Sequence, residues 1–167
     1  MLDSPYLEIN LRKIEENARH IVERCQPLGV EVLGVTKGFT ALPRIVSAMI
    51  AGGIEKMADS RIQNIAALRR RHFTNHVTLL RIPKLSSIDA LLKYVDCSVN
   101  SEYKVIRAIS DKAQARGLRH DIILMVDVGD LREGALPDEA IALAEQVAHL
   151  PGVRLAGIGT NMGCYGG

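Results

Sequence analysis

Along this chain, short apolar runs alternate with segments in which apolar residues recur at helical spacing, and this pattern predicts strands and helices in turn. Each short apolar run is followed by a segment whose apolar residues recur every three or four positions, as on one face of a helix. Six strands in this pattern alternate with helices, which is typical of parallel strands joined by right-handed crossovers. The six predicted strands are residues 31–37, 56–59, 77–82, 96–100, 121–128 and 154–161, and a shorter one at residues 6–11 precedes them.

Short polar residues and prolines mark where the predicted helices begin, because they supply a capping oxygen or fit a first helical turn. The glycine pair at residues 52 and 53 is expected to end the second helix. The residues expected to cap or open a helix are Asn10, Pro43, Ser60, either Ser86 or Ser87, Ser101 and Pro137.

An open doubly wound sheet and a closed barrel both fit this alternation. The open sheet usually carries a glycine-rich phosphate loop after its first strand, and none follows residues 31–37. A barrel places its chemistry at the carboxyl ends of its strands, where the unusual polar residues of this chain fall. These are Lys37, the run Asp59-Ser60-Arg61, Arg81, Asn100, Asp127 and Asn161. We therefore expect an α/β fold of the parallel (β/α)8 TIM-barrel type.

A complete barrel of this type needs eight strands and about 250 residues, whereas this chain has 167. About six strand–helix units are expected, so residues 1–167 would form an incomplete N-terminal barrel domain. The chain is a fragment, or a second chain completes it, or it has an unusual shorter fold. We favour the fragment.

Composition narrows the class of partner. The formal net charge of +2 is too small to indicate a nucleic acid or a membrane surface, so a small-molecule substrate is expected. Three scattered cysteines, no signal peptide and no membrane-length apolar run favour a reducing cytoplasm. His72 and His76 are four residues apart, but a predicted helix–strand boundary separates them and no third ligand follows, so no metal site is expected.

Lys37 is the first candidate for chemistry. Side chains alternate across a strand, so Leu33, Val35 and Lys37 share one face. If that face points into the barrel, the amine emerges at the mouth among apolar neighbours, and desolvation would suit it to Schiff-base formation. The alternative is a strand-end lysine that reaches solvent.

The last predicted strand carries glycines where a strand normally carries side chains. Leu155, Gly157, Gly159 and Asn161 would share a face, and the glycines could clear space for a flat ring beside Asn161. The alternative is a β-bulge or tight packing against a helix.

Arg132 lies in a loop after the fifth predicted strand, and its rigid donor fork suits a phenolate or a carboxylate. The alternative is a surface ion pair with Asp130 or Glu133. Asp127 would either orient Arg132 or cap the loop, and Arg81 would point either inward or into a surface pair.

Taken together, these segments resemble the alanine racemase family, fold-type III enzymes that use pyridoxal 5′-phosphate (PLP). The resemblance runs in order over nearly the whole chain. Residues 58–62 and 164–167 look closest to the ornithine racemase-like branch. The matching stretches are Val35-Thr36-Lys37-Gly38, the loop at residues 126–134, and Gly157-Ile158-Gly159-Thr160-Asn161-Met162.

The resemblance implies a role for each candidate. Lys37 matches the lysine that forms the internal aldimine with PLP, and Arg132 matches the arginine near the cofactor's phenolic oxygen. Asn161 falls where alanine racemases often carry a histidine packed against the ring. Residues 6–11 resemble the strand that joins a C-terminal β-domain in two-domain members, a domain this chain lacks.

The expected function is that of a PLP-dependent amino-acid racemase, interconverting L- and D-amino acids through a Lys37 Schiff base. By resemblance the full-length protein is a homodimer, and the second acid/base is a tyrosine from the partner's C-terminal domain. The phosphate-binding loops also fall outside the chain, so these residues alone should be catalytically poor. The alternatives are a non-catalytic PLP-binding protein serving cofactor homeostasis, and a decarboxylase or D-amino-acid lyase on the same barrel.

Overall fold

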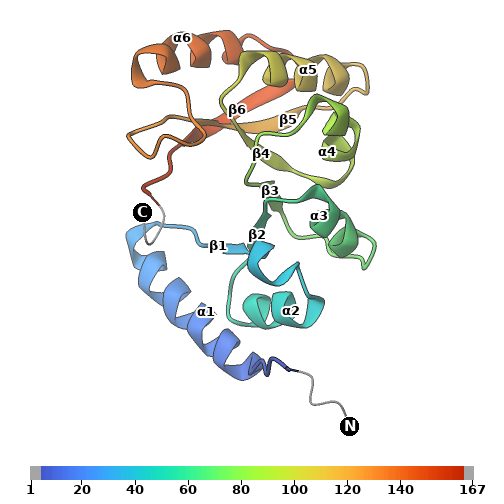
Figure 1. The fold of residues 1–167 in the computed structure, drawn as a ribbon, viewed down its shortest axis with the longest axis vertical. Coiled ribbons are helices and arrows are strands. Elements are labelled where there is room, and N and C mark those ends of the chain that lie inside the picture. The colour runs from blue at the N-terminus through green and yellow to red at the C-terminus, as the bar shows by residue number, and fades with distance from the viewer. Residues whose placement is uncertain (1–4, 164–167) are drawn as a thin grey trace.

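The computed structural model describes residues 5–163, in which strands and helices alternate (Figure 1). The strands are β1 (Leu33–Val35), β2 (Lys56–Asp59), β3 (Val77–Leu79), β4 (Cys97–Asn100), β5 (His120–Met125) and β6 (Val153–Gly159). The α-helices are α1 (Leu11–Cys25), α2 (Pro43–Ala51), α3 (Ile62–Arg69), α4 (Ile88–Tyr94), α5 (Tyr103–Gln114) and α6 (Pro137–Ala148). Three 3-10 turns complete the set: η1 (Gln26–Leu28), η2 (Lys37–Phe39) and η3 (Leu85–Ser87).

The six strands form one sheet in the order β1-β2-β3-β4-β5-β6, and every neighbouring pair is parallel. Strand order in a doubly wound sheet reverses at a switch point, and here it never does. Helices α2 to α6 lie on one side of this curved sheet (Figure 1). The prediction of the first six units of a (β/α)8 barrel is confirmed.

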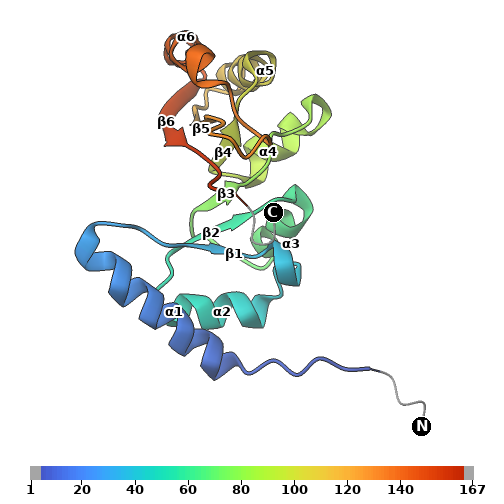
Figure 2. The same ribbon diagram turned by 60° about the vertical axis from the view of Figure 1, so that its left-hand side comes forward.

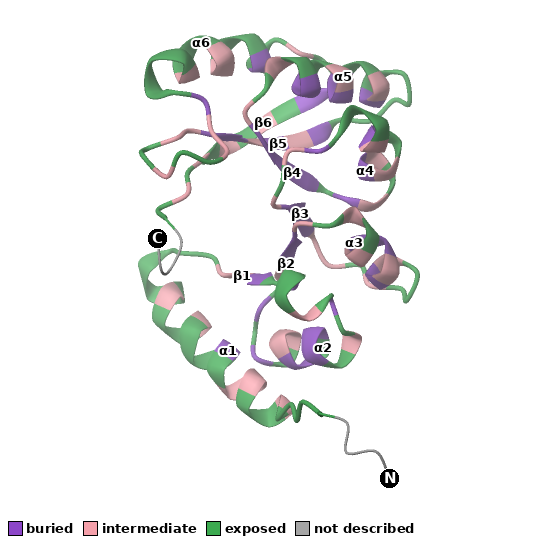
Figure 3. Cartoon of the chain, viewed as in Figure 1, coloured by how far each residue is buried: buried purple, intermediate pink, exposed green. Residues whose placement is uncertain are grey.

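The hydrophobic core fills the space between the sheet and its helices, as the band of buried residues shows (Figure 3). Met57, Leu79, Ile122 and Leu124 contribute the sheet side of this core. The helices contribute fully buried residues that include Ile65, Leu91, Ile106 and Ile109.

The other face of β1 looks away from the core. A methyl group added at Gly34 would lie 2.8 Å from the side chains of both Met49 and Met57, so Gly34 faces the helices. Val35 therefore faces the opposite side, and 41% of its surface is exposed. Alternation thus places Leu33 and Val35 on one face, as predicted, and this face is the barrel-interior one.

Helix starts agree with the sequence only in part. Asn10 caps α1, since its side-chain oxygen accepts a hydrogen bond from the Lys13 amide at 3.1 Å, and Pro43 and Pro137 open their helices. Two of the three predicted serine caps are wrong. Arg61 and Glu102 occupy the N-cap positions expected for Ser60 and Ser101. Ser87 does occupy an N-cap position, but its hydroxyl donates to the Lys84 carbonyl instead, and Ser86 lies inside η3.

Residues 6–11 do not form a strand in this structure. Leu11 is the first residue of α1, and residues 5–10 have no regular secondary structure (Figure 2). A strand needs a partner for its backbone groups, and no strand of the described chain pairs with this segment. Tyr6 and Leu7 are almost fully exposed. Joining a C-terminal domain stays a prediction for the full-length protein.

A buried polar cluster links β4 and β5 beneath the helices. The Nε2 atom of His120 lies 2.9 Å from the Ser98 hydroxyl, and the Asn100 amide donates to that same hydroxyl at 2.9 Å. Burial lowers the pKa of His120 from 6.5 to about 4. The imidazole therefore stays neutral in the folded protein across the physiological range.

This histidine predicts acid sensitivity. Below pH 6.5 the unfolded chain binds a proton that the folded chain excludes, so stability is lost as pH falls towards 4. The loss from this one group should be about 3 kcal/mol between pH 7 and 4. Urea titrations of the full-length protein would show a shallower pH slope for His120→Gln. An unchanged slope in His120→Gln would contradict the assignment.

Candidate active site

Lys37 lies directly beyond the carboxyl end of β1. The strand stops at Val35 rather than at Lys37 as predicted, and Lys37 opens the 3-10 turn η2. Its side chain is exposed, so the apolar surroundings expected for the amine are absent in this part of the protein. Within residues 5–163, Lys37 forms no ion pair and no side-chain hydrogen bond. An exposed, unpaired amine at this position is available to a ligand.

Thr36, which precedes Lys37 in the chain, and Asp59, which Thr36 contacts, have no role in the sequence-based prediction of the site. Thr36 is buried, and its hydroxyl donates to the Asp59 carboxylate at 2.6 Å. Asp59 was noted only as a polar strand end, because a link across 23 positions leaves no trace in local spacing.

A β-bulge changes which residues of β6 share a face. Ile122 pairs with Leu155 and Ile123 pairs with Gly157, so Ala156 is the extra residue. Leu155 therefore packs on the core side, whereas Gly157 follows Ile123 to the other face. The prediction that Leu155 shares a face with the glycines is wrong, since the alternation it assumed stops at the bulge.

The two glycines differ in the space around them. A methyl group at Gly159 would lie 3.0 Å from side-chain atoms of both Ile123 and Met125, while one at Gly157 would meet nothing within 4 Å. Gly157 thus leaves an open patch on the barrel-interior face. Both ideas about this strand hold in part, because the bulge is real and so is the cleared space.

The loop after β5 holds Arg132 between two acids. Its guanidinium lies 3.6 Å from Asp130 and 3.7 Å from Glu133, and 48% of the side chain is exposed. The alternative of a surface ion pair therefore describes this structure. Asp127 caps the loop, since its carboxylate accepts hydrogen bonds from the Gly129 amide at 2.8 Å and the Leu131 amide at 3.1 Å.

Asn161 follows β6 in a segment tied to the end of β5. The neighbouring Thr160 hydroxyl donates to the Val126 carbonyl at 2.8 Å. Lys37, Arg132 and Asn161 all lie beyond the carboxyl ends of their strands, on one edge of the sheet. β1 and β6 are the two outermost strands of the described sheet, and no hydrogen bond joins the three side chains within residues 5–163. The roles that the resemblance implies for Arg132 and Asn161 stay predictions.

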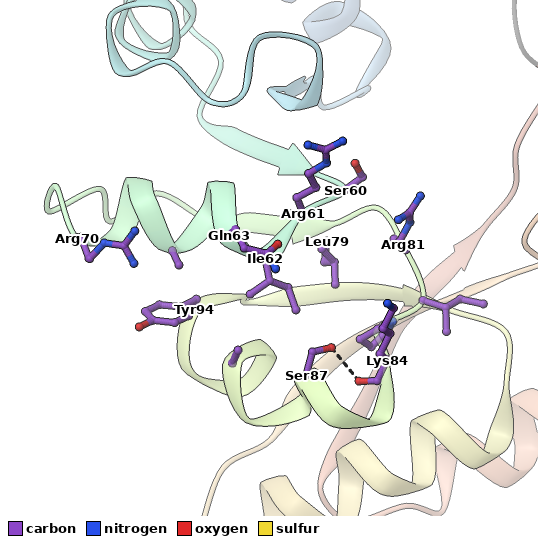
Figure 4. Close-up of a pocket in the computed structure, with 14 residues that line it drawn as sticks. Ser60, Arg61, Ile62, Gln63, Arg70, Leu79, Arg81, Lys84, Ser87 and Tyr94 are labelled. Carbon is purple, nitrogen blue, oxygen red and sulfur yellow. Dashed lines mark hydrogen bonds between the residues drawn. The ribbon is translucent and has the colours of Figure 1, made fainter.

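Arg81 forms no ion pair within residues 5–163, so the surface pair expected as one alternative is not seen there. The inward orientation of Arg81 towards a cofactor stays a prediction. Arg81 lines a hollow of about 540 Å³ between α3, the end of β3 and α4. Figure 4 shows Ser60, Arg61 and Arg81 towards one end of this hollow and Arg70 and Tyr94 towards the other. Four cations line it, namely Arg61, Arg70, Arg81 and Lys84, and no acidic residue does. The hollow is electropositive.

The described part of the chain shows neither a metal-binding cluster nor a membrane-spanning helix. Residues 5–163 hold no group of three or more histidine, cysteine or acidic side chains placed to bind a metal. His72 adopts a left-handed backbone conformation, and His76 has a buried ring nitrogen without a partner. No helix in this range combines the length and apolar character needed to cross a bilayer.

The residues that the chain supplies fit part of a PLP site. Lys37 offers an unpaired amine, which an aldehyde cofactor needs for covalent attachment. Gly157 leaves an open spot on the sheet face, which a flat ring needs for close approach. Both lie towards the carboxyl-end edge of the sheet, where barrel enzymes bind their ligands.

Comparison with known proteins identifies relatives along the whole chain. The lysine racemase of Thermotoga maritima is 37% identical over 98% of this chain and 45% of its own length. The ornithine racemase of Acetoanaerobium sticklandii is 34% identical over 97% of this chain and 46% of its own length. The chain therefore spans about half the length of these curated relatives.

Solved structures agree on the fold. The D-threonine aldolase of Filomicrobium marinum superimposes with a TM-score of 0.83 at 21% identity, over 94% of this chain and 44% of that protein. The family described as "Alanine racemase, N-terminal domain" matches residues 9–167. The predicted resemblance is thus confirmed, and the chain belongs to the alanine racemase N-terminal domain family.

Proposed function

We propose that the full-length protein is a PLP-dependent amino-acid racemase in which Lys37 holds the cofactor. The observation that carries this proposal is an exposed, unpaired lysine at the carboxyl end of β1 in a chain of this family. Alanine, lysine and ornithine racemases are PLP enzymes, which makes PLP the cofactor for such a lysine.

Each residue then has a defined task. The Lys37 amine holds the cofactor between turnovers and moves the Cα proton on one side of the substrate. When bound, PLP supplies the electron sink that makes this proton acidic. Arg132, which ion-pairs with Asp130 and Glu133 here, would donate towards the cofactor's phenolic oxygen. The acid/base for the other side comes from a C-terminal domain of the second subunit in a homodimer.

The substrate proposed is a basic amino acid with a terminal side-chain amine. Its support is similarity: the relatives at 37% and 34% identity are named as lysine and ornithine racemases, and the alanine racemases compared are 24–29% identical. The fold alone does not identify the reaction, because a D-threonine aldolase has the same fold.

A chiral assay of the full-length protein with PLP tests this function. Lysine or ornithine should interconvert between L and D forms with a kcat/KM at least about ten times that for alanine or serine, a difference of about 1.4 kcal/mol. Covalent PLP binding without interconversion would instead support the cofactor-homeostasis alternative. Loss of D-amino acid with appearance of a cleavage product would support a lyase, and either result would overturn the racemase proposal.

A further inference from the structure

Asp59 is a carboxylate buried completely at the end of β2, and no cation pairs with it within the described residues. Hydrogen bonds satisfy it instead. Its Oδ1 accepts from the Arg61 amide at 2.8 Å, and both of its oxygens lie 3.1 Å from the Asn64 side-chain amide. The Thr36 hydroxyl donates to Oδ2 at 2.6 Å. One carboxylate thus joins the ends of β1 and β2 to the start of α3.

Thr36 is the residue immediately before Lys37, and all of its polar groups are engaged. Its amide donates to the Ala58 carbonyl at 2.8 Å, which continues the β1–β2 ladder past the last residue of β1. Its carbonyl accepts from the Phe39 amide at 3.3 Å and from the Ala41 amide at 3.1 Å. The hydroxyl bond to Asp59 supplies the third anchor.

The turn that these anchors hold is strained. Thr40 and Ala41 have φ values of 51° and 54°, in the left-handed region that residues other than glycine rarely adopt. Such conformations persist only where the surrounding contacts impose them, and they gather at functional sites. Here the buried Ala41 and the Thr36 carbonyl close the turn that begins at Lys37.

Burying a charge is costly, and an apolar pair of similar size would hold two strand ends together at lower cost. What a short charge-assisted bond adds is a defined geometry at the donor. Reaction rates respond steeply to the placement of the reacting group, about 100-fold for a displacement near 1 Å.

We propose that Asp59, acting through Thr36, is a positioning residue that fixes the turn from which the Lys37 amine projects. This inference rests on the proposed function of Lys37, and neither Asp59 nor Thr36 contacts substrate in it. Asn64 and the Arg61 amide hold the Asp59 carboxylate in place. The bond from the Thr36 hydroxyl to this carboxylate then fixes the backbone at Thr36, and with it the backbone of Lys37.

The test uses the full-length protein and the isosteric change Thr36→Val, which removes the hydroxyl and keeps the shape. Thr36→Ser restores a hydroxyl. The control is Ser110→Ala, which also removes a buried hydroxyl. Ser110 lies on α5, away from Lys37, and its hydroxyl accepts a hydrogen bond from the Gly152 amide at 3.0 Å. Both Thr36→Val and Ser110→Ala should lower stability.

Of these two variants, only Thr36→Val should change the reactivity of the Lys37 amine. We expect it to slow the covalent attachment of added PLP to the apo-protein, followed by absorbance, about tenfold, and to lower kcat about 30-fold, with KM changed less than about threefold. Thr36→Ser should recover most of both losses, and Ser110→Ala should stay within about twofold of the parent. Equal rates in Thr36→Val and Ser110→Ala would overturn the inference.

Asp59→Asn provides a second route, since it keeps the size of the side chain and removes its charge. If the folded Asp59→Asn protein can be recovered, it should reproduce the slow attachment of PLP and the fall in kcat. If it cannot be recovered, the Thr36→Val result alone tests the inference.

Lys37→Ala separates the two proposals. If it still binds PLP covalently and turns over, the function assigned to Lys37 fails. If it does neither while Thr36→Val behaves like its control, the positioning inference alone fails.

Discussion

Full-length protein carrying Lys37→Ala should lose racemase activity by about 1,000-fold or more. The amine has two tasks in the proposed function, holding the cofactor and moving the Cα proton, and general acid–base catalysis alone is worth about 10² to 10⁴. Loss of the covalent anchor adds to this. Because Lys37 is exposed and unpaired within residues 5–163, its removal breaks no described contact and should leave stability unchanged within about 0.5 kcal/mol.

Lys84→Ala is the matched control for this change. Lys84 is also exposed and also without an ion pair in the described chain, and it follows β3, two strands away from β1 in the sheet. Its substitution should leave turnover within about threefold of the parent. A Lys37→Ala protein that racemises as fast as the Lys84→Ala protein would contradict the function assigned to Lys37.

Gly152→Ala should produce the largest loss of stability, about 3 kcal/mol or more. Gly152 lies in the turn before β6, and an added methyl group would lie 2.0 Å from the Ser110 carbonyl oxygen and 2.7 Å from its carbon. Both are backbone atoms of α5 and cannot rotate away. The turn cannot shift either, because the Gly152 carbonyl accepts from the His120 amide at 3.0 Å and its amide donates to the Ser110 hydroxyl.

The midpoint of urea unfolding, with the slope checked, measures this loss. Gly38→Ala serves as the control for stability alone, since a methyl group there would meet nothing within 4 Å. Its midpoint should stay close to that of the parent. A Gly152→Ala protein with the parent's midpoint would show that α5 and β6 do not pack as closely as described.

The order of elements could be predicted from sequence because each strand and helix carries its own periodicity. Local chemistry was also readable where it acts within one turn, as with Asn10, whose oxygen reaches an amide three residues on. The prediction of Ser60 as a cap failed because a helix start can shift by one residue. The helix α3 begins one residue later than expected, so Arg61 rather than Ser60 occupies the N-cap position.

Features that depend on contacts between distant segments could not be predicted from the sequence. The bulge at Ala156 is a matter of register with β5, and it reversed the side on which Leu155 was expected. The length of β1 was overestimated at both ends, because only three of its residues pair with β2. The burial of Asp59 and its bond to Thr36 need the fold to be known first.

The candidate site, too, could be predicted from the sequence only in part. Lys37 was found by its place at a strand end and by family resemblance, and the structure leaves its amine free among the described residues. Arg132 was found by the same resemblance, yet its guanidinium lies beside Asp130 and Glu133 here. The sequence offered both the ion pairs and the cofactor contact, and only the fold shows that the ion pairs form here.

The central claim is that PLP attaches to Lys37, and borohydride reduction of the full-length protein with PLP, followed by peptide mass mapping, tests it most directly. Reduction makes the bond between cofactor and lysine permanent, so the labelled peptide identifies the residue. The account predicts one dominant label, on the peptide that contains Lys37, and its disappearance in Lys37→Ala. A label on another lysine, or one that persists undiminished in Lys37→Ala, would contradict it.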